Sequence, residues 1–238
     1  MAKILSKVVY QFDTAVSSKT FAAGDVDIAN NNVTILNHGM KTAQPVGILA
    51  GTTIPTGLTE ATTGYYIINV DASTIAFASS AANAYAGTKI DITAAGSGTN
   101  TIYLNGAGIV NLGVLPDNFV ITDCWYDVTT TYITDDGTTP GNDAGTLALS
   151  TGQGAGDLKV AIAVSDATNV WDSGFHGTLI TAPNLGADAA HDTALEVIDL
   201  YNDIKLKLTA DRVPILTFAT ETATAGALSL FVEGYQGS

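Results

Sequence analysis

The segment Val120–Val128, VITDCWYDV, decides the class of fold that this sequence predicts. Its β-branched and aromatic residues favour a strand, because such side chains fit a pleated, half-buried surface. Successive side chains of a strand point to opposite faces. The two faces are then expected to carry Ile121, Asp123, Trp125 and Asp127 on one side and Thr122, Cys124, Tyr126 and Val128 on the other.

Further segments of the same character follow one another at short intervals, with turns rich in Gly, Asn, Asp and Thr between them. Short strands at such spacing are typical of sandwiches and barrels, so the sequence predicts an all-β fold. The expected strands cover residues 7–12, 32–36, 65–70, 74–78, 89–93, 100–104, 158–164, 205–208, 213–219 and 227–235. One helix is expected over 188–202, with Asp188 as its cap, and a short helical turn over 81–86.

The composition excludes several classes of protein. The chain has 238 residues, of which 46% are hydrophobic and 13% charged, which is too apolar for a disordered protein. Its formal net charge of -14 argues against nucleic acid and against an anionic membrane as partners. A single cysteine excludes a disulfide framework. We expect no targeting segment and no membrane span.

Charge is distributed unevenly along the chain. Residues 1–21 hold three lysines and one aspartate, residues 22–104 carry a net charge of -3, and residues 105–238 carry -13. A basic N-terminal arm on an acidic body can direct docking, although three solvated lysines would give the same pattern.

No group of residues signals catalysis, a cofactor or a metal. The three histidines lie far apart, and we expect His38, in a turn after a strand, to be structural. The run Asp172–His176 contains Asp, Ser and His, but a catalytic triad needs these groups to converge from separate elements. Cys124 is expected to be a small buried residue.

Two loop segments could suggest ligand sites. The glycine-rich run 106–113 does not match a phosphate-binding motif, and no helix follows it. An acidic loop contains Asp135, Asp136, Asn142 and Asp143, whose oxygen atoms could hold Ca²⁺. These residues lack the spacing of a calcium loop, so a solvated acidic loop is the expectation.

Residues 32–99 resemble a small β module that recurs in virion proteins of bacteriophages. The resemblance rests on a strand followed by His38-Gly39, the segment Ile54–Leu58, and the strand Tyr65–Asp71. An alanine- and asparagine-rich stretch at 78–88 and the run Gly96–Thr99 complete it. This resemblance implies a virion protein and says little about its role.

Four other stretches resemble strands of head-decoration or cement proteins of tailed phages. They are Lys7–Asp13, Val120–Thr130, Asp157–Ala167 and Thr224–Tyr235. The resemblance implies a jelly-roll-like β-sandwich. Together, the two resemblances imply that residues 1–21 and 105–238 form the sandwich and that 22–104 are a small β domain inserted after its first strand. Two tandem domains, 1–104 and 105–238, remain an alternative.

The function that the resemblance implies is reinforcement of a phage head. Such a protein lies on the capsid surface of the virion, bridges subunits of the major capsid protein and self-associates, with a homotrimer the expected form. We expect the basic arm and first strand to face the capsid, and the inserted domain to project outward. The expected contact residues are Lys3, Lys7, Val8, Val9, Tyr10 and Phe12, and removal of residues 1–7 is expected to abolish binding.

Two other functions stay open at this stage. A tail or head-fibre component that binds a host receptor would show an exposed cluster of aromatic residues, for which Tyr65, Tyr66, Phe77 and Tyr85 are the candidates. A glycan hydrolase would need two carboxylates facing each other across a cleft, and no such pair stands out in the sequence.

Overall fold

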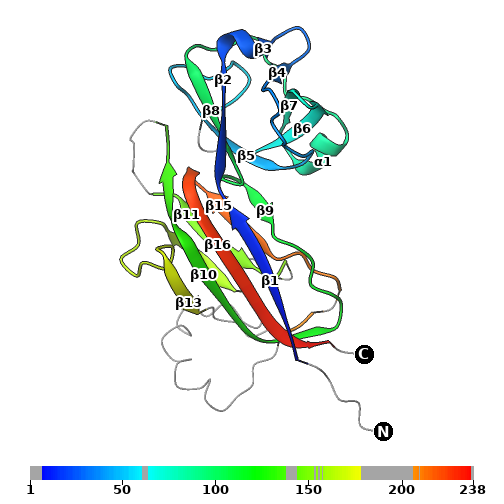
Figure 1. Cartoon of the computed structure of the whole chain (residues 1–238), viewed down its shortest axis with the longest axis vertical. Coiled ribbons are helices and arrows are strands. Elements are labelled where there is room, and N and C mark those ends of the chain that lie inside the picture. Colours follow the sequence, from blue (N-terminus) through cyan, green and yellow to red (C-terminus); the bar gives the residue numbers. More distant parts are fainter. Residues whose placement is uncertain are drawn as a thin grey trace.

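The computed structural model describes residues 7–60, 64–137, 144–152, 154, 156, 158–177, 206–208 and 210–236 (Figure 1). These residues lie almost entirely in strands and turns, which confirms the all-β class. The described ranges contain one α-helix, α1 (Ala81–Tyr85), where the sequence predicts a helical turn. The helix expected over 188–202 lies outside the described residues.

The first sheet is built on two long strands, β10 (Phe119–Asp135) and β16 (Thr222–Gln236), which pair antiparallel. β1 (Lys7–Ala15) pairs with the other side of β16, so that β1, β16 and β10 run side by side in Figure 1. β13 (Gly174–Gly177) and the short β14 (Leu206–Lys207) pair with the far side of β10.

The second sheet has the order β12-β11-β15-β9. Its strands are β9 (Ile109–Asn111), β11 (Thr146–Ser150), β12 (Lys159–Ala163) and β15 (Ile215–Ala219). Side chains from both sheets form one core. Within it, Trp171 is 1% exposed, and its indole Nε1 donates a hydrogen bond to the carbonyl of Ile162 at 3.1 Å.

Strand pairing follows a simple rule along the chain. With β14 left aside, the first strand of the sandwich pairs with the last, the second with the seventh, the third with the sixth and the fourth with the fifth. These pairs are β1 with β16, β9 with β15, β10 with β13, and β11 with β12. A chain folded double in this way gives the strand order of a jelly roll, and we interpret the β-sandwich as jelly-roll-like.

Between β1 and β9 the chain forms a seven-stranded sheet of order β2-β8-β5-β6-β7-β4-β3, which we call the inserted module. A separate core fills it, with Ile48, Ile67 and Ile102 completely buried. Its strands are β2 (Ser17–Ala22), β3 (Val26–Asp27), β4 (Asn32–Thr34), β5 (Pro45–Leu49), β6 (Tyr65–Asp71), β7 (Thr74–Ala78) and β8 (Thr99–Leu104).

The change from one sheet to the other falls earlier than the expected boundary between residues 21 and 22. β1 pairs with β16 up to Ala15, whereas β2 pairs with β8 from Ser17 onward. Only Val16 lies between them. The chain therefore leaves the sandwich at Val16, because the backbone hydrogen bonds of residues 17–22 go to β8.

Two local expectations are wrong. Residues 89–93 form no strand, because their backbone N–H groups bond to scattered partners: Ile90 to the carbonyl of Phe77, and Ile92 to the side chain of Asn31. Ile121 does not share a face with Asp123, since the register of β10 against β16 shifts between these two residues. A β-bulge adds one residue and reverses the alternation of faces, and Ile121 is buried in the core.

The inserted module packs closely against the start of β16. The N–H of Ala223, in β16, donates to the carbonyl of Gly106 at 2.6 Å. Gly47, in β5, faces the fully buried Thr222, and a Cβ added at Gly47 would lie 2.3 Å from Cγ2 of that threonine. The junction between the two units therefore leaves no room for a side chain at position 47.

We expect Gly47→Ala to lower the free energy of unfolding by about 1–3 kcal/mol, because the new methyl group overpacks a closed contact. Thermal and urea denaturation measure this loss. Gly24→Ala is the matched control, since an added Cβ there meets nothing within 4 Å. Equal stability of the two variants would show that the junction is not closely packed.

Candidate functional site

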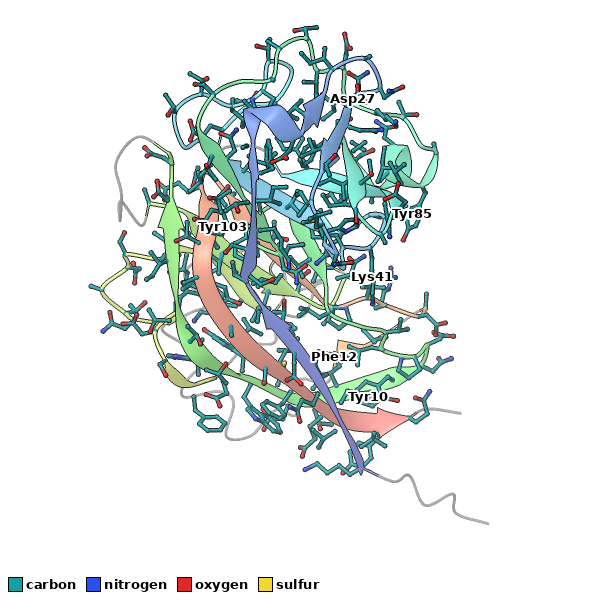
Figure 2. The ribbon with its side chains drawn as sticks, turned by 45° about the horizontal axis from the view of Figure 1, so that its top comes forward. Tyr10, Phe12, Asp27, Lys41, Tyr85 and Tyr103 are labelled. Carbon is teal, nitrogen blue, oxygen red and sulfur yellow. The ribbon has the colours of Figure 1, made fainter. Side chains whose placement is uncertain are left out.

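β1 contains most of the residues expected to contact a capsid, and it lies at the edge of the first sheet. Its side chains alternate, so that Val8 and Tyr10 pack against the sandwich core and Phe12 is 9% exposed within it (Figure 2). The side chain of Phe12 is therefore not available to a partner, which corrects its expected role. Val9 points outward and is 49% exposed. Lys3 lies outside the described residues.

Lys7 forms an ion pair with a residue of the neighbouring strand. Its Nζ lies 2.5 Å from a carboxylate oxygen of Glu233, which is directly across from the neighbouring Val9 in the register of β1 with β16. The hydrogen bond from Lys7 to Glu233 raises the pKa of the lysine above its usual value. Lys7 therefore remains charged at neutral pH, and half of its side chain is exposed.

The outer face of the first sheet carries aromatic side chains that the sequence reasoning did not assign to a site. Phe231 lies between Gln11 of β1 and Trp125 of β10, and residues paired in this way point to the same face. The Phe231 and Trp125 rings are stacked, with centroids 5.5 Å apart and planes inclined by 10°. On β13, Phe175 pairs with Asp127 and is 74% exposed.

Carboxylates surround these rings. On this face the cross-strand pair Asp123–Glu233 lies on one side of Trp125–Phe231, and the pair Asp127–Ser229 lies on the other. Asp13 accepts hydrogen bonds from the hydroxyl of Ser229 at 2.6 Å and from the amide of Gln11 at 3.0 Å, and these bonds lower the pKa of its carboxyl group. We call this surface the acidic-aromatic face, defined by Lys7, Val9, Gln11, Asp13, Asp123, Trp125, Asp127, Phe175, Phe231 and Glu233.

One signal in the sequence points to this face. A tryptophan at position 125 alternates with aspartates at 123 and 127, so it lies on the polar side of its strand. Aromatic residues are enriched at protein interfaces, so a large aromatic residue on a polar strand face indicates a candidate binding surface. Phe231 and Phe175 could not be added from the sequence, because only the pairing of β10 with β16 and β13 brings them to the tryptophan.

The edge of β1 offers a second kind of contact. The nine residues of β1 pair with β16 in an unbroken register, without a bulge. They include no proline, and among the described residues no strand pairs with the other edge of β1. A long, regular edge strand leaves N–H and C=O groups ready to pair with a strand of a partner.

The residues considered for catalysis do not form a reactive group. His176 Nε2 bonds to the backbone carbonyl of Asp172 at 2.8 Å, and its ring stacks on Tyr126. Cys124 is buried, as expected. Among the described residues, no three His, Cys, Asp or Glu side chains are grouped to hold a metal, and Asn142 and Asp143 of the acidic loop lie outside those residues.

His38 is 4% exposed and links two parts of the inserted module. Its Nδ1 accepts a hydrogen bond from the N–H of Met40 at 2.9 Å, and its Nε2 lies 2.7 Å from the carbonyl of Asp71. Because Nδ1 accepts, we assign the ring hydrogen to Nε2, which donates to the carbonyl of Asp71. The structural role expected for this histidine follows from these two bonds.

Replacing His38 with alanine leaves the buried N–H of Met40 without its acceptor, so we expect His38→Ala to lower the free energy of unfolding by about 1–3 kcal/mol. His38→Asn should recover part of this loss, since its carbonyl can accept from Met40. Urea denaturation followed by circular dichroism measures both. Equal losses in the two variants would contradict the role given to Nδ1.

Among the described residues, no helix is long and apolar enough to span a membrane. The chain matches no protein-family model, no curated protein and no solved structure. What the protein does must therefore be inferred from its own fold and surfaces.

Proposed function

We propose that this chain is a structural protein of a bacteriophage virion, which decorates the capsid surface and stabilises the head by bridging subunits of the major capsid protein. The observation that carries this proposal is that the molecule has two different ends, the sandwich at one and the inserted module at the other. β1 begins and β16 ends at the end of the sandwich far from the inserted module (Figure 1). A body of this form can dock by one end and one face while the module projects outward.

The acidic-aromatic face supplies the docking chemistry. Aromatic side chains supply much of the energy of protein interfaces, since they bury large areas at low cost in conformational entropy. The four carboxylates outnumber Lys7 on this face, and Lys7 is paired with Glu233. The complementary patch on the capsid protein is therefore basic, and an arginine there can also stack on the exposed ring of Phe175.

Cement activity then follows from the number of contacts. A single weak contact per copy is sufficient when many copies engage one shell, because avidity multiplies the contributions. Closed threefold association of the protein would present three docking faces to one lattice position. The free edge of β1 can add backbone hydrogen bonds to a strand of either partner.

The alternative, a fibre component that binds a host receptor, has less support. Of its four candidate aromatic residues, Tyr65 and Phe77 are buried in the core of the inserted module. They contribute to packing, and the exposed cluster that this alternative needs is reduced to Tyr66 and Tyr85.

The contact strand can be tested with a pair of matched substitutions. Val9 is 49% exposed on β1, and Val160 is 55% exposed on β12 of the other sheet. We expect Val9→Lys to weaken binding to purified phage heads at least tenfold, because it puts a positive charge opposite the basic patch of the capsid protein, while Val160→Lys binds as the unchanged protein does. Co-sedimentation with heads that lack the protein measures both.

Equal binding of both variants would refute the assignment of the face, even if the protein still binds heads. The function itself fails if class averages of virions with and without the protein show the added density on the tail rather than on the shell.

A further inference from the structure

A cleft of about 560 Å³ lies between the inserted module and the sandwich. One wall consists of Gly39, residues 41–45, Tyr66 and the start and end of α1, and the other consists of Asn105 and β9. Sites for small ligands usually have volumes of several hundred Å³ and occur between domains. The capsid-docking proposal does not use this cleft, since it lies away from the acidic-aromatic face.

Rings and aliphatic groups form part of the lining. Tyr85, at the end of α1, is 76% exposed, and Ile109, across the cleft on β9, is 45% exposed. Tyr66 adds a second, half-buried ring. Figure 2 shows Tyr85 and Lys41 on the side of the module that adjoins the sandwich. Exposed rings at the rim of a cleft offer flat apolar surfaces against which a ligand can stack.

The polar groups of the lining are neutral or basic. Gln44 and Asn111 provide amides, each of which can donate and accept hydrogen bonds, and Lys41 provides an ammonium group. None of the described residues that line the cleft is acidic, although the chain has 23 acidic residues. The lining therefore differs in charge from the rest of the molecule.

Hydrogen bonds within the protein fix the shape of the loop at one wall of the cleft. The side-chain carbonyl of Gln44 accepts from the N–H of Lys41 at 3.1 Å, and the N–H of Ala43 donates to the carbonyl of Ile67 at 2.8 Å. Ala43 has φ of +65°, a left-handed conformation that costs a residue with a side chain free energy. The loop 41–44 is therefore held in one unusual shape, which lowers the cost of ordering a ligand.

We propose that this cleft binds a short neutral oligosaccharide without cleaving it. Tyrosine rings suit the apolar C–H faces of pyranose rings, and amides with an ammonium group suit hydroxyl groups, which both donate and accept. Glycoside hydrolysis needs two carboxylates at the scissile bond, and the lining supplies none. The net charge of -14 disfavours an anionic sugar.

The test uses the full chain and four defined sugars: maltotriose, cellotriose, triacetylchitotriose and tri-galacturonic acid. Saturation-transfer NMR and titration should show saturable binding of at least one neutral trisaccharide in the millimolar range or tighter. Tyr85→Ala should weaken it at least tenfold, and Lys41→Ala by a smaller factor. Leu36→Ala is the matched control, because Leu36 is equally exposed (76%) but lies outside the cleft.

Three results would overturn the proposal: no saturable binding of any neutral sugar, equal binding by the Tyr85→Ala protein, or tighter binding of tri-galacturonic acid than of every neutral sugar. Release of shorter sugars during the titration would overturn the claim that the cleft only binds. Each of these results is independent of binding to phage heads, so the proposal for the cleft and the proposal for the acidic-aromatic face are tested separately.

Discussion

The antiparallel pairing of β10 with β16 is the contact on which the rest of the structure depends. β16 also pairs with β1 along its other side, and its first residues, Thr222 and Ala223, lie against the inserted module. One strand from the end of the chain thus orders the first strand, the central strand and the second unit. Since its partners lie about 100 and 220 residues away in the chain, the pairing entails a large loop-closure cost before any contact offsets it.

The sequence predicts those features that depend on local pattern. Side-chain alternation and turn residues predict the β class, the strands at 65–70 and 74–78, and the buried Cys124. They also predict the helical turn at the position of α1. The features that it misses depend on pairing between distant segments. Residues 89–93 have strand composition, but their N–H groups donate to scattered partners. The bulge after Ile121 reverses one face of a strand whose pattern is otherwise correct.

The acidic-aromatic face shows the same division. The sequence shows that the residues of the first strand alternate, with Val8, Tyr10 and Phe12 on one side and Lys7 and Val9 on the other. Which of the two sides points outward is decided by the second sheet, which packs against the first. The aromatic part of the face needs three strands from different parts of the chain, of which the sequence indicates only Trp125. Asp13 is also ordered by a neighbour: the hydroxyl of Ser229 donates to its carboxylate and lowers the pKa of that group, so Asp13 remains ionised at lower pH than an isolated aspartate.

The chain enters and leaves the inserted module through adjacent strands, since Ser17 is paired with Leu104. Cross-strand partners have Cα atoms about 5 Å apart, so Val16 could be joined to Asn105 by a short peptide without moving the sandwich strands. A stretch of gene coding for residues 17–104 could thus be gained or lost as one cassette. The β-sandwich could then stay unchanged while the unit that it carries is exchanged for another.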